Sequence, residues 1–403
     1  MSAKKRIMQI CGGTWQVPLI QYIKAQGYEV VNSNLYEDSP CFAYADFKEV
    51  VDVLDKEKNL EIAKRYNVDA VVTDQSDISV PTVAYIADKL GLAGIGVDTA
   101  KLFTNKLNMR QFCQNHGFAS PEFALCHSAD DVISFIEKVG RKIVIKPLDS
   151  QSSRGVFVIE KNEDIRALFE ESKHYSKDGE SVIAERFITG TEFTVDGIMT
   201  PSGHRSLCIS QKAHYPYNEC IASELFFSYS NPNYDYDLLR ATNDAMLNAT
   251  GLRFGLTHVE YRYENGRYYL MEFAARGGGT KIASHIVPLM SGVDNYGYLL
   301  KCALGETPDV DMIIDPSLRD RCAVLKFFSF DTHGKPVKAI QGLEEIKEND
   351  QVVDIMLEFD IGDRLQKALD DRYRVGFYIA YEQNAEKLHK LMQWIEDTLV
   401  LAY

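Results

Sequence analysis

Residues 255–279, GLTHVEYRYENGRYYLMEFAARGGG, carry the clearest structural signal in the chain. Two runs that alternate apolar and polar residues flank the dipeptide Asn265-Gly266. Asn-Gly between alternating strands is a strong signal for a tight β-hairpin. Glu260 lies five residues before Asn265, and Glu272 lies six residues after Gly266. The hairpin therefore predicts that these two carboxylates lie nearly opposite each other on adjacent strands.

The two glutamates indicate a metal site. Like charges directly opposite each other on two strands are destabilising unless a positive group lies between them. Mg²⁺ favours sparse carboxylate ligation of this kind together with phosphate oxygens. Apolar neighbours such as Val259 and Leu270 favour half-buried strands, whereas a pair that simply faces solvent is the alternative. Arg276 follows Glu272 by four residues and precedes three glycines, so it can reach the same phosphate or its developing charge.

A second polar cluster follows a buried strand predicted at residues 142–146. Lys146 ends that strand, and the loop after it, LDSQSSRG at residues 148–155, supplies hydroxyls, backbone N–H groups and an arginine. A polyphosphate needs fixed positive charge with small donors of this kind, although a merely solvated lysine is the alternative. The P-loop pattern Gly-x-x-x-x-Gly-Lys-Ser/Thr does not occur, and the turn at Gly12-Gly13 lacks the Gly-x-Gly-x-x-Gly of dinucleotide-binding folds.

Residues 182–196, VIAERFITGTEFTVD, resemble the hinge strand of the ATP-grasp superfamily, and the likeness covers the chain from residue 1 to at least residue 305. The resemblance implies that Glu185 accepts a hydrogen bond from the adenine amino group and that Glu192 binds the ribose hydroxyls. It implies that the rest of the ATP site is lined by Arg186, Phe187 and Ile188 at the base and by Ser153, Arg154 and Gly155 of the lid loop.

The same resemblance assigns roles around the phosphates. Lys106 and Lys146 resemble the two lysines that contact the α- and β-phosphates. Glu260 and Glu272 match the acidic ligands of Mg²⁺, for which Mn²⁺ can substitute. Arg276 matches the arginine that stabilises the transferred phosphoryl group.

Two features near these residues depart from the usual ATP-grasp pattern, and one further candidate residue lies in a stretch without a clear motif. Many ATP-grasp enzymes have asparagine two residues after the second metal glutamate, but this chain has Ala274, so a second Mg²⁺ needs another ligand or binds more weakly. The lid loop carries serines and an arginine in place of a run of glycines, which makes it more cationic and less mobile. Lys212 is expected to approach the γ-phosphate or the substrate carboxylate from a loop at residues 211–219 that has no clear motif.

Two stretches resemble one subgroup, which contains the L-amino-acid ligases and the short carbamoyl-phosphate-synthase-like proteins. They are EFAARGGG at residues 272–279 and GGTWQVP at residues 12–18. The implied activity is an ATP-dependent ligase that joins a small carboxylic acid to an amine through an acyl phosphate. The alternatives are a bicarbonate-activating carboxylase or carbamoyl-phosphate type enzyme, and a nucleotide-binding module without turnover.

Candidate substrate residues are less specific. His258 shares a strand face with Glu260 and is either close to the phosphate or metal, or a structural histidine. Ser284 and His285 are expected to face the acceptor pocket. The turn at Gly12 and Gly13 is expected to help bind the carboxylate or the acceptor.

The predicted fold class is α/β and α+β. Strand and helix signals alternate over the first hundred residues, as in a doubly wound parallel sheet. An apolar helix is expected after the glycine-rich turn, running on toward Leu304. The expected parts are a pre-ATP-grasp domain at 1–102, a linker helix region at 103–125, a lid at 126–195, a catalytic subdomain at 196–305 and an α+β extension at 306–403.

Composition limits the partners. The 403 residues carry 44 Lys and Arg against 58 Asp and Glu, a net charge of −14, so no general attraction to nucleic acid or to an anionic membrane is expected. No stretch approaches the 18 or so apolar residues that span a bilayer, and no signal peptide is apparent, so we expect a cytoplasmic protein. The eight cysteines contain no Cys-x-x-Cys pair, which favours reduced, buried thiols. We expect a homodimer, because most soluble oligomers are symmetric dimers.

Overall fold

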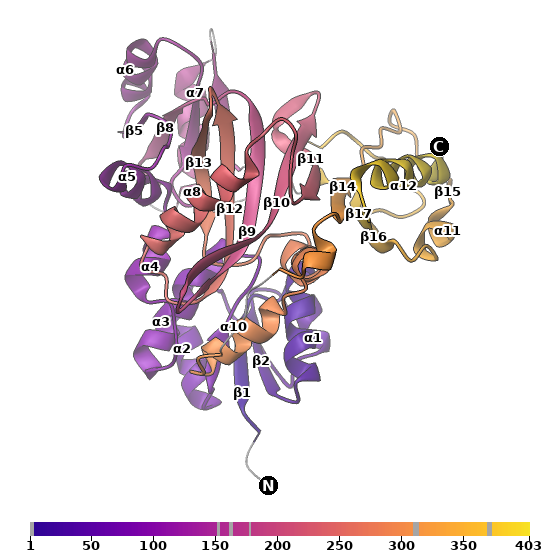
Figure 1. Ribbon diagram of the computed structural model, residues 1–403. Coiled ribbons are helices and arrows are strands. Elements are labelled where there is room, and N and C mark those ends of the chain that lie inside the picture. Colours follow the sequence, from indigo (N-terminus) through magenta and orange to yellow (C-terminus); the bar gives the residue numbers. More distant parts are fainter. Residues whose placement is uncertain (1–3, 151–153, 161–163, 177–178, 309–313, 369–372) are drawn as a thin grey trace.

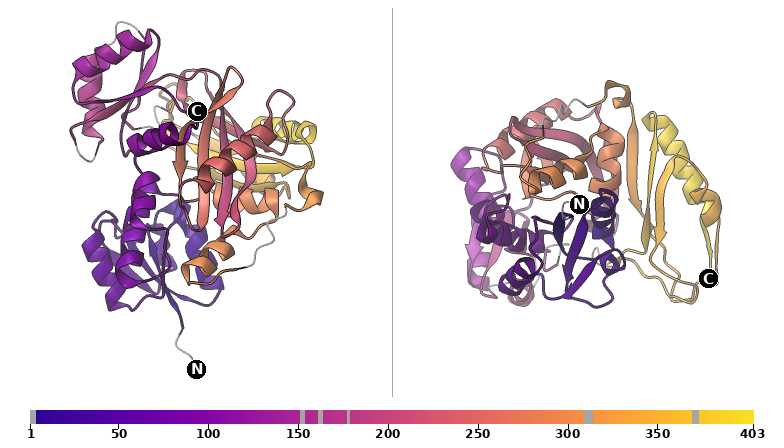
Figure 2. Two further views of the ribbon diagram at one scale, coloured as in Figure 1. Left: turned by 60° about the vertical axis from the view of Figure 1, so that its left-hand side comes forward. Right: turned by 90° about the horizontal axis from the view of Figure 1, so that it is seen from below.

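The structure is a computed structural model of the chain that describes residues 4–150, 154–160, 164–176, 179–308, 314–368 and 373–403. Figure 1 shows a parallel sheet with its helices at the bottom, a long central sheet above it, a small sheet at the upper left and a C-terminal unit at the right. The views in Figure 2 show that the small sheet stands clear of the N-terminal part, with the central sheet next to both.

The N-terminal part is a four-stranded parallel sheet of order β3-β2-β1-β4, which confirms the predicted parallel sheet. Its strands are β1 Arg6–Ile10, β2 Glu29–Asn34, β3 Phe47–Val50 and β4 Ala70–Val72, and its helices are α1 Val17–Ala25, α2 Lys56–Arg65 and α3 Val80–Leu90. Strand β3 was not predicted, because its burial alternates and it lies at the sheet edge with only one neighbour. The carboxyl ends of β1 and β4 lead into the turns that face the rest of the molecule.

Two helices connect this part to the small sheet. They are α4 Val97–Leu102 and α5 Lys106–His116, the second capped by the Asn105 side chain. The antiparallel small sheet has the order β5-β8-β6-β7. Its elements are β5 Phe123–Cys126, α6 Ala129–Val139, β6 Ile143–Pro147, β7 Phe157–Ile159, α7 Ile165–His174 and β8 Val182–Arg186. Apolar residues of α6 and α7 pack on one face of this sheet, which leaves its other face toward the central sheet.

The central sheet has eight antiparallel strands in the order β13-β12-β9-β10-β11-β14-β17-β16. Its first five strands are β9 Thr191–Thr200, β10 Gly203–Tyr215, β11 Asn218–Ser228, β12 Gly255–Glu264 and β13 Arg267–Ala274, with α8 Tyr236–Asn248 packed against β10. The loop predicted at residues 211–219 is wrong, since β10 runs on to Tyr215 and β11 begins at Asn218. Lys212 and His214 of this stretch line a chamber whereas Tyr215 is buried in the core, so the stretch lacks the apolar run that would signal a strand.

The last strands of this sheet come from the C-terminal part. They are β14 Cys322–Phe327, β16 Val352–Leu357 and β17 Gly376–Glu382, covered by α12 Ala385–Thr398. A short helix α11 Leu343–Lys347 and a two-stranded sheet of β15 Ala339–Gln341 and β18 Val400–Ala402 complete this part. One sheet therefore contains strands from both sides of the boundary proposed at residue 305, and the five-part division stays a prediction.

The continuous helix predicted toward Leu304 is wrong. The chain forms a π-helical turn Ile282–Ile286, α9 Val287–Ser291 and α10 Asn295–Ala303. Gly292 ends α9 in the left-handed region at φ +75°, and the Asp294 side chain then caps α10. The apolar pattern persists across these breaks because each piece packs into the same core.

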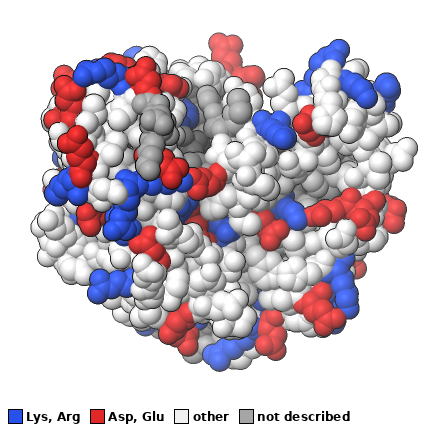
Figure 3. Space-filling view, turned by 90° about the horizontal axis from the view of Figure 1, so that it is seen from above, with Lys and Arg blue, Asp and Glu red and all other residues white. Residues whose placement is uncertain are grey.

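Two predictions drawn from composition can be compared with the structure. Cysteines 11, 41, 113, 126, 208, 302 and 322 are free and buried, as expected. No helix among the described residues has the length and apolar character needed to span a membrane. On the face drawn in Figure 3, basic and acidic side chains lie interspersed and not in one large field of a single sign.

Candidate active site

The hairpin β12–β13 places Glu260 directly opposite Glu272, as the sequence predicts. The unequal spacing from the turn is absorbed by a bulge, because the next pair is Tyr261 with Leu270 and Met271 is left over. The carbonyl of Met271 accepts a hydrogen bond of 2.6 Å from Nη2 of Arg110. A fully buried arginine from α5 thus satisfies the backbone group that the bulge takes out of the sheet.

Each glutamate of this pair contacts a lysine. Nζ of Lys212 lies 2.7 Å from Oε1 of Glu260, and Nζ of Lys106 lies 3.1 Å from Oε1 of Glu272. Burial opposes ionisation of Glu260, but the Lys212 charge outweighs it and lowers the pKa of this carboxyl far below its ordinary value. The like charges of the opposed pair are therefore balanced by two lysines, the predicted phosphate ligand Lys106 and Lys212, which was expected near the γ-phosphate or the substrate carboxylate.

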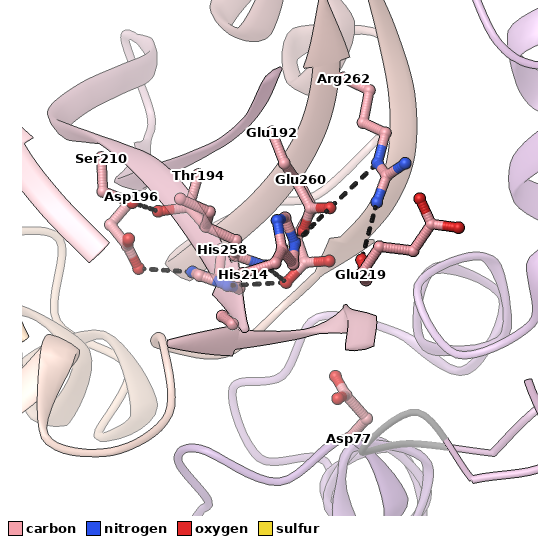
Figure 4. A network of polar contacts seen from close by, with 12 residues as sticks. Asp77, Glu192, Thr194, Asp196, Ser210, His214, Glu219, His258, Glu260 and Arg262 are labelled. Carbon is pink, nitrogen blue, oxygen red and sulfur yellow. Dashed lines mark hydrogen bonds and ion pairs between the residues drawn. The ribbon is translucent and has the colours of Figure 1, made fainter. Parts of the chain in front are cut away.

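Glu192 shares Lys212 with Glu260. Its Oε1 lies 2.7 Å from Nζ of Lys212, and its Oε2 lies 3.1 Å from Nε of Arg262 and 3.3 Å from Nε2 of His214. Figure 4 shows Glu192, His214, Glu260 and Arg262 pointing toward one another. Burial raises the pKa of Glu192, and Lys212, His214 and Arg262 together lower it well below the ordinary value. The predicted ribose ligand is thus an ionised acceptor in a cationic surrounding.

Glu185 lies at the other end of the predicted nucleotide site and is fully buried on β8. Its Oε1 accepts from Nε of Arg110 at 2.7 Å, and its Oε2 accepts from Nζ of Lys146 at 2.8 Å. Burial opposes the charge, but the two cations lower the pKa of Glu185 to about 2. Both carboxylate oxygens thus have a cationic partner and the side chain has no exposed surface, so the contact with the adenine amino group that the resemblance implies stays a prediction.

The neighbouring hinge residues contact the central sheet. Nη1 of Arg186 lies 2.8 Å from Oε2 of Glu264, and the carbonyl of Ile188 accepts from Nη1 of Arg262 at 3.0 Å. The Phe187 ring lies under the charges of Lys142 and Arg262. These contacts fix β8 and the segment after it against β12.

His258 belongs to the same network from β12. Its Nδ1 lies 2.9 Å from Oδ1 of Asp196, and its Nε2 lies 3.6 Å from Oε1 of Glu260. Burial opposes protonation, but Asp196 more than offsets it and raises the pKa of His258 to about 9. Figure 4 shows the imidazole between the two carboxylates. Both roles predicted for His258 fit this position, since it lies beside Glu260 and each of its ring nitrogens has a carboxylate partner, so the choice between them stays a prediction.

Arg276 faces this network from the start of the glycine-rich turn. Its guanidinium forms two parallel contacts with Asp77, with Nε 3.0 Å from Oδ1 and Nη2 2.7 Å from Oδ2. Asp77 lies in the turn between β4 and α3, so the pair joins the N-terminal part to the central sheet. Figure 4 shows Asp77 rising from the N-terminal part toward the network. Burial disfavours the Arg276 charge, but Asp77 and neighbouring carboxylates raise its pKa.

A chamber of about 800 Å³ lies where these parts meet. The N-terminal part, the central sheet and the C-terminal part all contribute to its wall. Its lining includes Gly13, Trp15, Gln75, Asp77, Glu192, Lys212, His258, Glu260, Glu272, Arg276, Leu325, Phe327, Met356, Arg374 and Phe377. Charged groups of the sheet and apolar side chains of the C-terminal part therefore face each other across one space large enough for a phosphate chain and a second molecule.

The remaining predicted substrate residues fall in different places. Gly13 lines the chamber, whereas Gly12 packs so closely on Asn32 that a Cβ atom would lie 2.5 Å from its Oδ1. Ser284 and His285 do not line the chamber among the described residues, and Oγ of Ser284 instead lies 2.7 Å from Nδ1 of His285. They are carried away from it because the predicted helix is replaced by a π-helical turn.

The lid loop is described in part. Ser153 lies outside the described residues, and Arg154 and Gly155 directly follow it. Gly155 has φ +69°, and an added Cβ would lie 2.8 Å from the Tyr175 ring and 2.9 Å from Pro147. A glycine is therefore required where the loop turns back into β7.

Several residues of the site were missed by sequence reasoning. They are Asp77, Arg110, Asp196, His214 and Arg262. Only Arg110 had a recognisable signal, since it follows Lys106 by one helical turn on α5 and so shares its face. The others are ordinary polar residues whose partners lie more than fifteen residues away along the chain.

The site is suited to a metal that is shared with a ligand. Within the described part of the chain, no group of three or more His, Cys, Asp or Glu side chains could hold a metal ion. Glu260 and Glu272 supply two carboxylates, and Ala274 adds no side-chain donor next to them. Mg²⁺ commonly takes one or two carboxylates and completes its octahedron with water and phosphate oxygens, so the donor set fits Mg²⁺ bound together with a nucleotide.

Comparisons with known proteins agree with this geometry. Residues 139–284 match the family described as ATP-grasp domain, and residues 326–403 match L-amino acid ligase C-terminal domain 2. Residues 139–284 form an ATP-grasp domain, and the chain as a whole has the ATP-grasp fold. The resemblance and the fold class inferred from the sequence are confirmed.

Three relatives show how far the likeness extends. The crystal structure of L-amino acid ligase from Bacillus licheniformis aligns with a TM-score of 0.82 at 20% identity over 100% of both chains, which shows the same fold. The L-arginine-specific L-amino acid ligase of Bacillus subtilis is 24% identical over 344 residues, 83% of this chain and 81% of that protein. A formate-dependent phosphoribosylglycinamide formyltransferase of Prochlorococcus marinus is 25% identical over 210 residues, 51% of this chain and 54% of that protein. The chain thus spans about half the length of the formyltransferases it matches.

Proposed function

We propose that this ATP-grasp protein is an ATP-dependent ligase that joins a carboxylic acid to an amine through an acyl phosphate. One observation carries the proposal. Two opposed carboxylates, Glu260 and Glu272, each contact a lysine and line one chamber with Arg276. This is an arrangement of fixed charges for a polyphosphate with a metal, and the chamber beside it has room for a second molecule.

ATP would occupy the space between the small sheet and the central sheet. Glu185 and the backbone after it would bind the adenine, and Glu192 would bind the ribose. Lys106 and Lys146 would leave their carboxylate partners for the phosphates, because a phosphate chain offers each lysine a stronger acceptor than a shared glutamate.

Glu260 and Glu272 would hold Mg²⁺, with Mn²⁺ as a substitute, and this ion would neutralise charge on the β- and γ-phosphates. When Glu260 binds the ion, Lys212 would lose its contact with Glu260. It would remain beside Glu192, within reach of the γ-phosphate or the substrate carboxylate. Arg276 would stabilise the charge on the transferred phosphoryl group.

The reaction has two displacements. A carboxylate oxygen attacks the γ-phosphorus, the bond from that phosphorus to the bridging oxygen breaks, and ADP leaves. The amine nitrogen then attacks the acyl carbon, the bond from that carbon to the phosphate oxygen breaks, and phosphate leaves while the nitrogen loses a proton to solvent. The chain's part is to orient the two reactants and to exclude water from the acyl phosphate.

An ADP-release screen tests the proposal. Purified protein is incubated with Mg²⁺ and ATP against amino acids, hydroxy acids and sugar acids, each with and without an amine, and against bicarbonate and formate. ADP release that requires an acid, together with an amide product found by mass spectrometry, is the expected result. Release with bicarbonate alone would favour a carboxylase, and binding of ATP without release under all conditions would favour a nucleotide-binding module.

The variant Glu272→Gln tests the proposed metal site in the same assay. It removes one metal ligand while keeping the shape of the side chain, so ADP release should fall by at least 100-fold and the folded state should be kept. Glu224→Gln is the control, because Glu224 pairs with Lys326 at 3.4 Å on the same sheet but does not line the chamber. Full activity in Glu272→Gln would contradict the metal assignment.

A cytoplasmic location and a homodimer stay predictions. Size-exclusion chromatography with light scattering tests the oligomeric state directly.

A further inference from the structure

The turn after β4 contacts the glycine-rich turn at three successive points. Oδ1 of Asp74 accepts a hydrogen bond from the Gly277 N–H at 2.8 Å, and Oε1 of Gln75 accepts one from the Lys281 N–H at 3.2 Å. The Asp77 carboxylate forms an ion pair with the Arg276 guanidinium. Two of these contacts hold backbone and the third holds a functional side chain. The N-terminal part therefore holds the turn that carries the predicted catalytic arginine in one conformation.

Asp77 fixes the Arg276 side chain in one orientation. Its two oxygens bind Nε and Nη2 at 3.0 and 2.7 Å, and Nη1 donates to the Gly277 carbonyl at 3.0 Å. Both side chains of the pair are largely buried, with 14% and 18% of their surface exposed. A planar guanidinium held at all three nitrogens cannot rotate about its last bonds without breaking an ion pair.

The same contacts leave part of the guanidinium available. Arginine has five N–H donors, and the contacts above use three of them, which leaves one on each terminal nitrogen. Both residues line the chamber beside Glu260 and Glu272. Two N–H groups fixed beside the metal carboxylates are what a transferred phosphoryl group requires, since a donor that is already oriented costs no reorganisation during the reaction.

We propose that Asp77 is the positioning residue for Arg276, and that through this pair the N-terminal part sets the efficiency of phosphoryl transfer. The inference rests on the proposed ligase function. A pair that only joined two parts of the molecule would not need to lie in the chamber or to hold a side chain with two donors to spare. Figure 4 shows the Asp77 carboxylate pointing from the N-terminal part toward the side of the network.

Asp77→Asn is the direct test. The amide keeps the size of the side chain but loses the charge and one of the two acceptors, so kcat for ADP release should fall by roughly 10- to 100-fold while KM for ATP changes by less than about twofold. Asp130→Asn is the matched control, because Asp130 forms an exposed pair with Arg166 at 2.7 Å and lies away from the chamber. A variant Asp77→Asn with unchanged kcat would overturn the inference.

A double-mutant cycle separates positioning from an independent role. In an Arg276→Ala background, Asp77→Asn should lower kcat by less than about twofold, since there is no guanidinium left to position. If the double variant lowers kcat by the product of the two single effects, Asp77 acts independently of Arg276 and the inference is overturned.

Phosphate binding keeps the test independent of turnover. With MgADP bound, calorimetric titration with inorganic phosphate should give a Kd that is roughly 10-fold higher in Asp77→Asn than in the unmodified protein. Equal Kd values would overturn the inference even in a protein that turns over no substrate. A protein without ADP release in the full screen, in which Asp77→Asn still weakens phosphate binding, would contradict the proposed ligase function and retain the positioning role. If Asp77→Asn fails to fold, Asp77→Glu takes its place in the same comparison.

Discussion

Arg110 shows how a single residue connects the two ends of the proposed nucleotide site. Its Nε holds Glu185, which holds Lys146, and its Nη2 holds the carbonyl of the bulged Met271 next to Glu272. A fully buried charge with these partners is costly to disturb, because the carboxylate left behind cannot reach water. Arg110 therefore supports the adenine end and the metal end together, without contacting either ligand in the proposed reaction.

Arg110→Met should be strongly destabilising. The change leaves Glu185 buried with Lys146 as its remaining cation, so the free energy of unfolding should fall by about 3–5 kcal/mol in urea titrations. Arg166→Met removes an exposed pair with Asp130 and should cost less than about 1 kcal/mol. A small effect for Arg110→Met would mean that the site relaxes or admits water.

His204 makes stability depend on pH. It is fully buried, with Nδ1 2.6 Å from Asp244 and Nε2 2.7 Å from Thr257. Burial lowers the pKa of His204 below its ordinary value despite the nearby Asp244. The unfolded chain therefore binds more protons between the folded pKa and about 6.5, so stability should fall as the pH drops below about 6.5, by at most about 1.4 kcal/mol per pH unit.

Thermal unfolding at pH 7.5 and pH 5.5 measures this effect. The drop in Tm between the two conditions should be smaller in His204→Gln than in the unmodified protein. His333→Gln changes an exposed histidine and should leave the drop as it was. An equal drop in all three proteins would assign the acid sensitivity to other groups.

At the scale of elements, the hairpin β12–β13 is what makes the site possible. Alternation along each strand sends one face to the core around Val259 and Phe273 and the other to the chamber. The bulge shifts the register so that Glu260 and Glu272 pair, and β9 and β10 bring Glu192 and Lys212 beside them. Four charged side chains from four neighbouring strands thus occupy one patch without contacting the core.

Glu260→Gln should weaken the response to metal more than it changes the fold. With one of two carboxylates neutral, the Mg²⁺ concentration that gives half-maximal ADP release should rise by roughly 10-fold or more. Removal of metal with EDTA should abolish release in both proteins, and Glu224→Gln should titrate like the unmodified protein. A normal Mg²⁺ titration in Glu260→Gln would place the ion elsewhere.

At the scale of the molecule, the C-terminal part is joined to the central sheet by a β-ladder. β14 pairs with β11 over four residues, and the apolar side chains of both strands are buried, among them Leu225, Phe227 and Leu325. Leu225, Leu325 and Phe327 of these strands line the chamber, and Trp15 of the N-terminal part packs edge-on against Phe377 with ring centroids 5.7 Å apart. The chamber is therefore complete only when the N-terminal, central and C-terminal parts are present together.

Truncation after residue 321 should not give a smaller active enzyme. It would expose the β11 edge with its apolar residues, and such an edge promotes aggregation. We expect little soluble protein, and no ADP release from what remains. Removal of residues 400–403 deletes only β18 of a separate two-stranded sheet and serves as the control. A soluble, active truncation at 321 would show that the C-terminal strands are an appendage.

Local patterns in the sequence were sufficient for part of this protein. The hairpin with its opposed glutamates, the parallel N-terminal sheet and the order of most elements follow from alternation, Asn-Gly and glycine turns, because these act over a few residues. Lys146 and Arg276 were also predicted from the residues around them, whereas Lys106 and Lys212 came only from the resemblance. The charge of −14 is also a property of the sequence alone, and it requires that any polyanion be held by a local cluster of cations.

Only the tertiary structure decided the rest. The partners of Arg276, Glu185 and Lys212 come from segments that lie far apart along the chain, and no local preference specifies which carboxylate meets which cation. The polar residues Lys212 and His214, which line the chamber, hid the end of β10. An apolar run whose pieces all pack into one core hid the breaks before α10. The sequence determined which charges are present, whereas packing determined their pairing, since burial leaves a charge stable only where an opposite one lies within reach.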